Sequence, residues 1–559
     1  MTLLCAAIRV ESGEQALRDA GEAKRAGADL VEYRIDGFVE SHLNQSPERK
    51  RGVEVTQRDP SPQPSAGGRG SEIIELVASS PIPCVVTCRS AAEGGEFTGS
   101  DADRAALLQA IVEADQPPRY LDIELASLEQ SSELQALSAA LADRANVDSS
   151  APRVIVSLHD YQCRPADLSR RLARLRERDD ATIVKIAYRA RSLRDNLELF
   201  EIVRERDRPT IALGMGEFGL LSRVLAPKFG GFLTFASLQD NAATAPGQPT
   251  LGDLTNLYRL GSINPKTKVF GVIGWPIGHS LSPMVHNAAF EAIDYDGVYL
   301  PMPVPTEWEH FKATLGAMVD DRALDFTGAS VTIPHKEHLI RFAKERVDEG
   351  WTIDPIAEVA GAGNTIARAA DGWCVVNTDA PAIVSCLENA LGDLAGRTIL
   401  ILGAGGAARA AAAGLLESHA RALITNRNLD RAQKLVDELL LTADHGTETV
   451  ETVAWGDRGN VQVAAIINTT PVGMVGGSAP DQSPIDLAAI AQQSPDVVVF
   501  DSVYNPVVTP MLADARRLDL PTIDGVSLFV RQASLQSTLW TQQAPSEGLF
   551  DRLVRRRLG

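Results

Sequence analysis

The chain lacks the features of a secreted, membrane-bound or nucleic-acid-binding protein. Its six cysteines form no Cys-x-x-Cys pair and no dense framework, as is typical of a reducing compartment. Basic residues are few: 54 Lys and Arg stand against 73 Asp and Glu, a formal charge of −19, whereas phosphate binding needs a cationic face. The apolar start, residues 1–7, is too short for a signal segment or a membrane span. We expect a cytoplasmic protein with no nucleic-acid or membrane partner.

Length and composition indicate several ordinary globular domains. At about 100 to 250 residues per domain, 559 residues predict two to four domains, each able to bury a core. The hydrophobic share of 44% and the charged share of 23% are ordinary for a soluble enzyme, and the two halves share no repeat.

The first half alternates strand-like and helix-like segments. Helical patterns occupy 14–26, 102–114, 166–178 and 195–203. Eight β-branched runs between turn signals read as strands, and they centre on Leu3, Val31, Val85, Ile123, Val154, Val184, Ile211 and Phe232. Eight such units predict a (β/α)8 barrel.

Two segments interrupt this pattern. Residues 46–70 combine Pro, Gly, Ser and a basic cluster with few apolar residues, which predicts a disordered surface insertion, and its basic run reads as a solvated loop. Residues 246–264 read as the end of the barrel and a linker. A second α/β region starts at residue 268.

Lys185 lies in a β-branched run, 182–187, where a buried ammonium is costly unless its pKa falls or it takes part in chemistry. A neutral amine there suits Schiff-base chemistry. Taken alone, a strand lysine is more often a solvent-facing or salt-bridged residue. Polar side chains, however, end five of the expected strands, where such barrels place their active sites; they are Glu32, Arg34, Asp36, Arg89, Glu124, His159, Asp160 and Lys185.

Residues 1–250 resemble type I 3-dehydroquinate dehydratase. The motifs that carry the resemblance are 29–36, 122–124, 157–160, the Lys185 strand, 215–216, 222–223 and 245–248. The resemblance implies that Lys185 forms an imine with the ketone of 3-dehydroquinate, that His159 moves the protons and that Glu124 orients His159. It assigns substrate binding to Glu32, Arg34, Arg89, Arg223, Thr244 and Gln248, with Thr244 in place of the usual Ser.

The second half contains a nucleotide-binding pattern. A strand at 398–402 runs into Gly403-Ala404-Gly405-Gly406-Ala407 and an Ala-rich helix, a turn that receives a pyrophosphate on backbone N–H groups. The next strand ends in Asn426-Arg427, where an NAD-binding protein presents a carboxylate. A cation there favours NADP over NAD, unless it is a plain surface residue.

Other polar residues of this half suit a substrate site. Lys336 follows a short strand and a proline, so it projects from a strand end as a proton donor would. Ser280 and Ser282 have the spacing to hold one carboxylate, although they also suit helix caps. Residues 361–365 and 377–379 add two more polar strand ends.

Residues 268–545 resemble shikimate dehydrogenase, and the resemblance makes Lys336 and Asp379 the catalytic pair. It assigns the substrate to Ser280, Ser282, Thr332, Asn364, Tyr504 and Gln532. It assigns the cofactor, NADP, to Gly403, Ala404, Gly405, Gly406, Ala407, Asn426, Arg427, Arg431, Thr469, Met474 and Gly525. Ser330 stands where this family often has Asn.

Together the halves resemble the fused dehydratase-dehydrogenase of aromatic biosynthesis. The resemblance implies a barrel at 1–250, a substrate domain at 268–380 completed by helices at 525–559, and a Rossmann domain at 381–524. It implies conversion of 3-dehydroquinate through 3-dehydroshikimate to shikimate with NADPH, and no metal. Two alternatives stay open: a fusion acting mainly on quinate, and a non-catalytic regulator, which the two retained lysines and the acidic charge disfavour. Oligomeric state is not readable from the sequence.

Overall fold

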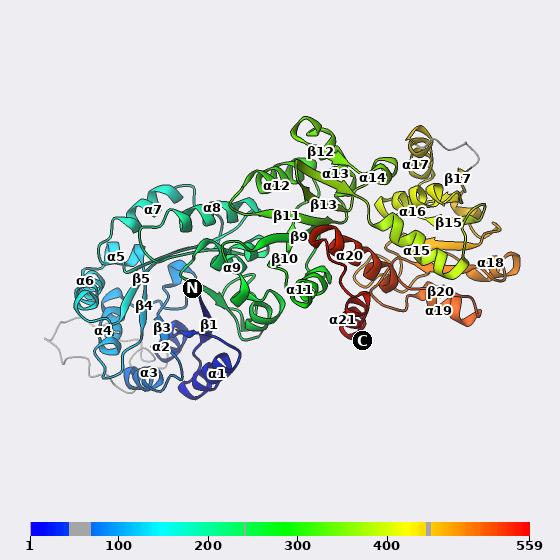
Figure 1. Cartoon of the computed structure of the whole chain (residues 1–559). Coiled ribbons are helices and arrows are strands. Elements are labelled where there is room, and N and C mark those ends of the chain that lie inside the picture. Colours follow the sequence, from blue (N-terminus) through cyan, green and yellow to red (C-terminus); the bar gives the residue numbers. More distant parts are fainter. Residues whose placement is uncertain (1, 44–68, 240–241, 443–448) are drawn as a thin grey trace. The chain divides into compact units, whose positions relative to one another are not determined.

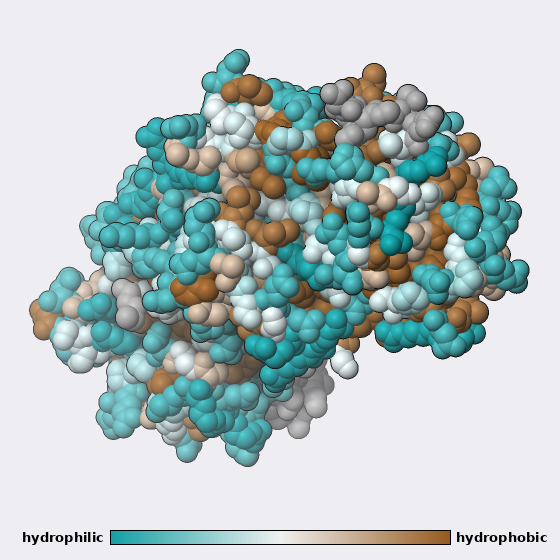
Figure 2. Space-filling view, turned by 45° about the vertical axis from the view of Figure 1, so that its right-hand side comes forward, coloured by the Kyte–Doolittle hydropathy of each residue, from teal (hydrophilic) through white to brown (hydrophobic). Residues whose placement is uncertain are grey.

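The computed structural model describes residues 2–43, 69–239, 242–442 and 449–559 (Figure 1). The chain divides into two compact units, Met1–Thr267 and Lys268–Gly559. Among the described residues, no helix is both long and apolar enough to cross a membrane. Figure 2 shows one face, on which hydrophilic residues are interspersed with smaller groups of hydrophobic ones.

The first unit is a parallel eight-stranded barrel, so the predicted fold class is confirmed. Its strands lie in the order β7-β6-β5-β4-β3-β2-β1-β8, and the Phe232 N–H before β8 donates to the Thr210 carbonyl of β7 at 2.9 Å. The strands are β1 (Leu3–Arg9), β2 (Leu30–Arg34), β3 (Cys84–Thr87), β4 (Tyr120–Glu124), β5 (Arg153–Asp160), β6 (Ile183–Arg189), β7 (Thr210–Met215) and β8 (Leu233–Ala236).

Helices cover the outside of the barrel (Figure 1). They are α1 (Gly13–Arg25), α2 (Asp36–Leu43), α3 (Arg69–Ala78), α4 (Asp101–Val112), α5 (Leu125–Gln130), α6 (Ser132–Val147), α7 (Leu168–Arg176), α8 (Arg194–Arg204), α9 (Leu220–Val224) and α10 (Ala226–Phe229). The four predicted helices correspond to α1, α4, α7 and α8. The expected insertion at 46–70 lies outside the described residues except for Arg69 and Gly70, which begin α3.

Strand register places the polar residues of the barrel side by side. Glu124 on β4 pairs with Ser157 on β5, and Ser157 pairs with Lys185 on β6. Because aligned residues of parallel neighbours point to the same side of a sheet, these three side chains share one layer of the barrel interior.

The second unit begins with a mixed sheet in the order β10-β9-β11-β13-β14-β12, in which β13 runs antiparallel to β11 and β14. Its strands are β9 (Lys268–Gly274), β10 (Gly297–Pro303), β11 (Phe326–Val331), β12 (Trp351–Ile353), β13 (Thr365–Ala369) and β14 (Gly372–Val376). Its helices are α11 (Ser282–Ala292), α12 (Trp308–Asp320), α13 (Lys336–Lys344) and α14 (Pro355–Ala360).

A parallel sheet follows in the doubly wound order β17-β16-β15-β18-β19-β20, as expected for a Rossmann domain. Its strands are β15 (Thr398–Leu402), β16 (Arg421–Thr425), β17 (Val450–Thr452), β18 (Ala465–Asn468), β19 (Val498–Asp501) and β20 (Thr522–Ile523). Its helices are α15 (Asp379–Leu391), α16 (Gly406–Glu417), α17 (Leu429–Thr442), α18 (Leu487–Gln493) and α19 (Pro510–Arg517).

The last two helices return to the mixed sheet. Helix α20 (Gly525–Thr541) and helix α21 (Glu547–Leu558) pack against α11, next to the green strands in Figure 1. They bury an apolar cluster made of Val285, Ala289, Val526, Phe529, Val530, Ala533, Phe550 and Val554. This packing ties the C-terminus of the chain to the sheet on which the second unit begins.

We predict that Phe550→Ala destabilises the second unit by about 3 to 5 kcal/mol, because the ring is fully buried and its removal leaves a cavity. All six tryptophans follow residue 268, so tryptophan fluorescence during urea unfolding reports on this unit alone. Leu535→Ala, at a 41% exposed position of α20, is the control and should change stability by less than about 0.5 kcal/mol. Equal unfolding midpoints for the two variants would contradict the role of this cluster.

Candidate active sites

A cavity opens where the polar residues of the barrel converge. All the residues that the resemblance assigns to this site except Glu124 line it, whereas Asp36 and Asp160 do not. Its lining is Glu32, Arg34, Arg89, His159, Tyr161, Lys185, Ala187, Leu213, Met215, Arg223, Phe235, Thr244, Ala245 and Gln248.

Lys185 is buried and held by opposite charges. Its Nζ lies 2.8 Å from Asp122 Oδ2 and 3.6 Å from Glu32 Oε1, and it stands over the Phe235 ring, 4.4 Å from the centroid. A buried amine needs such partners, because taking it out of water is otherwise costly. These contacts hold the amine at the cavity wall.

Arg89 joins the carboxylates of β4. Its guanidinium lies 3.0 Å from Asp122 and 3.3 Å from Glu124, and it donates to Ser157 Oγ at 2.9 Å. Burial alone disfavours the charge on Arg89, but these two carboxylates outweigh it and raise its pKa. Burial likewise opposes ionisation of Asp122, yet Arg89 and Lys185 hold its pKa below the ordinary value.

His159 contacts Glu93 and not Glu124, which corrects the pairing expected from the sequence. Glu93 Oε2 lies 3.3 Å from His159 Nδ1 and accepts the His159 backbone N–H at 3.0 Å. Burial, and then the charges of Arg89 and Lys185, keep the pKa of His159 well below its usual value. Burial raises the pKa of Glu93 to about 7. His159 is therefore a neutral imidazole near pH 7.

Glu124 instead anchors the loop that carries Glu93. It accepts the Ser90 backbone N–H at 2.9 Å and binds Arg104 Nη1 at 2.8 Å. Glu93 ends a short 3-10 helix, Ala91–Glu93, and the next residue, Gly94, has a positive φ of 76°. The Glu93-Gly94-Gly95 run, which begins six residues after the end of β3, is the sequence signal that could have indicated a tight loop presenting a carboxylate.

Arg223 is a buried cation with no carboxylate partner among the described residues. Its Nε donates to the Gly214 carbonyl at 3.1 Å, and burial lowers its pKa to about 10. Nearby, Gln248 Oε1 accepts from the backbone N–H and the hydroxyl of Thr244, at 2.9 and 3.1 Å. The hydroxyl of Thr244 therefore makes its loop contact despite the added methyl group. Arg223 is placed to bind an anion that enters the cavity.

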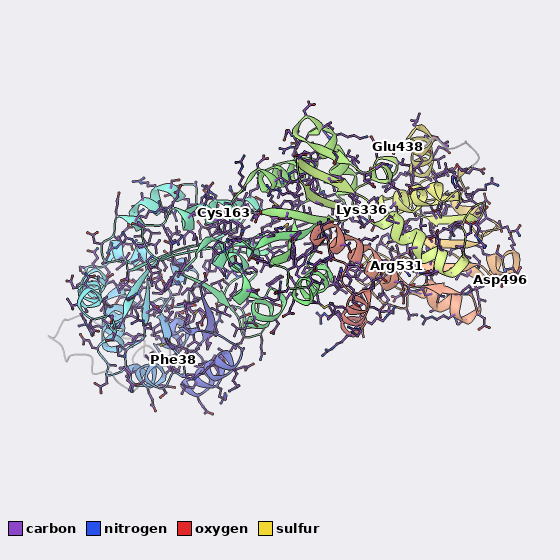
Figure 3. All side chains as sticks on the ribbon, viewed as in Figure 1. Phe38, Cys163, Lys336, Glu438, Asp496 and Arg531 are labelled. Carbon is purple, nitrogen blue, oxygen red and sulfur yellow. The ribbon has the colours of Figure 1, made fainter. Side chains whose placement is uncertain are left out.

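In the second unit, Lys336 and Asp379 meet. Lys336 Nζ donates to Asp379 Oδ2 at 2.5 Å, and the two residues begin α13 and α15. Lys336 also lies against the glycine-rich turn, since a Cβ on Gly406 would be 2.9 Å from its Cδ. Figure 3 labels Lys336 at the junction of the green helices and the yellow-green Rossmann helices. The pair thus lies next to the predicted cofactor loop.

Asn364 connects several predicted substrate residues. Its Nδ2 donates to Thr378 Oγ1 at 3.0 Å and to Gln532 Oε1 at 3.3 Å. The Thr332 methyl packs against Gly274, where a Cβ would lie 2.4 Å from it.

Ser280 and Ser282 lie at the start of α11. Ser280 Oγ accepts the Ser282 N–H at 3.3 Å, so the cap interpretation and the site interpretation are compatible for Ser280. Tyr504 packs on Phe529 beside the backbone of Gly525, where a Cβ would lie 2.7 Å from Tyr504 N.

The glycine-rich turn fits a dinucleotide. Gly403 has φ +123°, and a Cβ there would lie 2.5 Å from Thr469 Oγ1, which donates to the Leu402 carbonyl at 2.7 Å. A Cβ on Gly405 would meet nothing within 4 Å, so the turn leaves open space in front of the α16 N-terminus. Ala404 and Ala407 complete the turn, and Met474 on the neighbouring loop is 38% exposed.

The end of β16 fits a phosphate on the adenosine ribose. Arg427 and Arg431 are exposed and have no ion-pair partner among the described residues. Asn426 Nδ2 donates to the Asn428 carbonyl at 2.9 Å, which shapes the turn into α17. Two free guanidinium groups beside a nucleotide loop suit a 2′-phosphate.

The two units therefore define a two-site enzyme: a lysine-histidine barrel followed by a nicotinamide-dinucleotide dehydrogenase fold. Three family models match: type I 3-dehydroquinase at residues 4–265, the shikimate dehydrogenase substrate binding domain at 272–366, and shikimate / quinate 5-dehydrogenase at 385–457.

The bifunctional 3-dehydroquinate dehydratase/shikimate dehydrogenase, chloroplastic, of Arabidopsis thaliana is 34% identical over 567 residues, covering 98% of this chain and 83% of that protein. The shikimate dehydrogenase (NADP(+)) of Citrifermentans bemidjiense is 37% identical over 303 residues, 53% of this chain and 98% of that protein. A solved structure, dehydroquinate dehydratase and shikimate dehydrogenase from S. pombe AroM, aligns at 24% identity with a TM-score of 0.42, covering 99% and 98% of the two chains. The chain belongs to the family of bifunctional 3-dehydroquinate dehydratase/shikimate dehydrogenases.

We predict that the ring signals of His159 in a ¹⁵N-histidine NMR spectrum shift with a midpoint near pH 7, because Glu93, whose pKa is raised to about 7, ionises against its Nδ1. The imidazole itself does not titrate there, since its pKa is well below the usual value. Glu93→Gln should abolish this step. Glu124→Gln should keep it at a somewhat lower pH, because the Glu124 charge raises the Glu93 pKa. Loss of the step in Glu124→Gln alone would restore the pairing expected from the sequence.

Proposed function

We propose that the barrel dehydrates 3-dehydroquinate to 3-dehydroshikimate and that the second unit reduces this product to shikimate with NADPH. The observation that carries the proposal is the joint placement of two lysine sites, Lys185 with His159 and Lys336 with Asp379, in a chain of this family. The product of the first reaction is the substrate of the second.

In the barrel, the Lys185 amine condenses with the substrate ketone, releases water and forms an imine. The imine nitrogen withdraws electrons and acidifies the adjacent C–H. Asp122 Oδ2 accepts a hydrogen bond from Lys185 Nζ at 2.8 Å and holds this nitrogen at the cavity wall. Hydrolysis of the imine later returns the free lysine.

His159 moves the protons of the elimination. Glu93 engages Nδ1, so Nε2 is the nitrogen that faces the substrate as a base. The protonated ring then gives that proton to the departing hydroxyl, which leaves as water. Glu93 therefore takes the orienting role that the resemblance assigns to Glu124.

Arg223 binds the substrate carboxylate, because it is a buried guanidinium that no carboxylate of the described residues neutralises. The remaining cavity residues bind the ring hydroxyls and the loop over them; they are Glu32, Arg34, Arg89, Thr244 and Gln248.

In the second unit, Lys336 donates a proton to the ketone oxygen of 3-dehydroshikimate, and Asp379 keeps its ammonium in place at 2.5 Å. NADPH supplies a hydride when bound. The turn at 403–407 with Thr469 and Met474 would hold its pyrophosphate and nicotinamide ends, and Asn426, Arg427 and Arg431 its phosphorylated ribose. The substrate residues are Ser280, Ser282, Thr332, Asn364, Tyr504 and Gln532.

We further propose the domain limits 1–250, 268–380 with 525–559, and 381–524 for these functions, and a cytoplasmic location. The location rests on composition, whereas the Arabidopsis relative is named as chloroplastic.

Replacing either lysine should silence one reaction and spare the other. Lys185→Ala should abolish dehydration, and borohydride with 3-dehydroquinate should add mass at Lys185 in the wild type.

Lys336→Ala and Asp379→Asn should lower the rate of 3-dehydroshikimate reduction by ~10²- to 10⁴-fold, the usual contribution of a positioned acid-base group. Each activity is the control for the other, and quinate assayed in parallel tests the quinate alternative. Dehydration by Lys185→Ala, or unchanged reduction in the other variants, would refute these roles.

Arg427→Asp should shift cofactor preference from NADPH toward NADH, because it removes a phosphate contact and offers a carboxylate to a free ribose hydroxyl. We expect a loss of roughly tenfold to a hundredfold in NADPH affinity for a half-exposed charged contact. Arg421→Asp is the matched control, since Arg421 begins the same strand and pairs with Glu451 at 3.3 Å. Steady-state kinetic constants for NADPH and NADH, measured in the wild type and both variants, test this prediction. A wild type that prefers NADH would contradict the assignment of Arg427 to the 2′-phosphate.

A further inference from the structure

A chain of buried side chains runs through the substrate domain behind Asn364. It joins Tyr299 on β10, Ser330 on β11, Gln536 on α20, Thr365 on β13 and Asn364, and we call these five residues the relay. Every member is at least nine-tenths buried. Tyr299 reaches across β9, the strand between β10 and β11, to do so.

Backbone groups fix the direction of the hydrogen bonds at one end. The Thr378 N–H donates to Asn364 Oδ1 at 2.8 Å, so this atom must be the amide oxygen. Thr365 Oγ1 lies 2.9 Å from the same oxygen, and an oxygen without hydrogen can only accept. Thr365 therefore donates its one hydroxyl hydrogen to Asn364.

The same reasoning orders the rest of the relay. Gln536 Nε2 donates to the Asn364 backbone carbonyl at 3.4 Å and to Thr365 Oγ1 at 2.9 Å. The amide oxygen, Oε1, therefore faces Ser330. Ser330 donates to that oxygen at 3.0 Å. The single hydroxyl hydrogen of Ser330 is then engaged with Gln536. The Tyr299 hydroxyl, 2.6 Å away, must therefore donate its hydrogen to Ser330.

We infer that the relay is a positioning device that fixes the orientation of the Asn364 amide. With Oδ1 held by Thr378 and Thr365, the two Nδ2 hydrogens can point only toward Thr378 Oγ1 and Gln532 Oε1. The hydrogen that faces Gln532, itself a proposed substrate residue, is the one that a bound substrate can accept, so Asn364 offers the substrate a hydrogen-bond donor and not an acceptor. This inference rests on the proposed function, in which Asn364 and Gln532 hold the substrate.

The relay also explains why a serine at position 330 suits this structure. A short hydroxyl at this position can accept from Tyr299 and donate to Gln536 at once, whereas a side chain without both capacities would break the relay in the middle of the sheet. Because buried polar groups cost free energy when unpaired, the five residues depend on one another.

Thr365→Val tests the relay, because valine keeps the shape of threonine and removes the hydroxyl. In the full chain, with shikimate and NADP⁺, we expect KM for shikimate to rise about tenfold, the typical size of one lost hydrogen bond at a binding group, while kcat and KM for NADP⁺ stay near wild type. Thr365→Ser retains the hydroxyl and should restore the wild-type KM. Tyr299→Phe should raise the same KM by a smaller factor.

The controls separate positioning from general damage. Two control variants should leave KM for shikimate unchanged. Thr314→Val changes a buried threonine of α12 outside the relay, and Tyr295→Phe removes a hydroxyl that has no partner among the described residues. Tryptophan fluorescence during urea unfolding reports that the second unit of each variant is folded, because all six tryptophans lie in this unit. Equal KM values for Thr365→Val and Thr365→Ser, or a matching rise in KM for NADP⁺, would overturn the inference. A wild type that does not oxidise shikimate would refute the proposed function instead.

Discussion

The burial of Lys185 is the constraint on which the barrel site depends. A lysine amine inside a barrel needs opposite charge, and Asp122 and Glu32 supply it. Asp122 in turn pairs with Arg89, which also binds Glu124, so one buried charge belongs to a network drawn from β2, β4 and β6 and from Arg89 after β3. Burial, together with the positive charges of Arg89 and Lys185, keeps the pKa of His159 below its usual value. Burial and charge pairing thus yield both the nucleophile and the base.

In the second unit, the buried polar groups that need partners are mostly neutral. Apart from Lys336 and Asp379, its substrate side is built from amides and hydroxyls, and each buried one needs a partner. The relay satisfies them in a single direction, and the direction determines which hydrogen-bonding end of Asn364 faces the ligand. A polar core that satisfies itself therefore also sets the chemistry presented to the substrate.

Both sites lie where parallel strands end, which explains why one chain of ordinary composition can carry two chemistries. In the barrel, register places Glu124, Ser157 and Lys185 in one layer. In the Rossmann sheet, the end of β15 and the start of α16 bring Gly406 against Lys336. In each case the sheet fixes the backbone, and short loops supply the side chains.

The sequence by itself determined the eight barrel strands, the Rossmann turn and nearly all the polar residues of the cavity, because strand periodicity and strand-end polarity are local patterns. It did not determine which carboxylate contacts the His159 ring. Glu124 was assigned to His159 because it stands in a strand motif with Asp122. Glu93 instead lies in a loop whose path depends on Gly94 and on the Glu124 contact with Ser90. Nor did it show the relay, whose members come from four elements up to 237 residues apart, Tyr299 to Gln536. Such partners are chosen by tertiary packing, since a hydrogen bond depends on where folding brings two atoms and not on their separation along the chain.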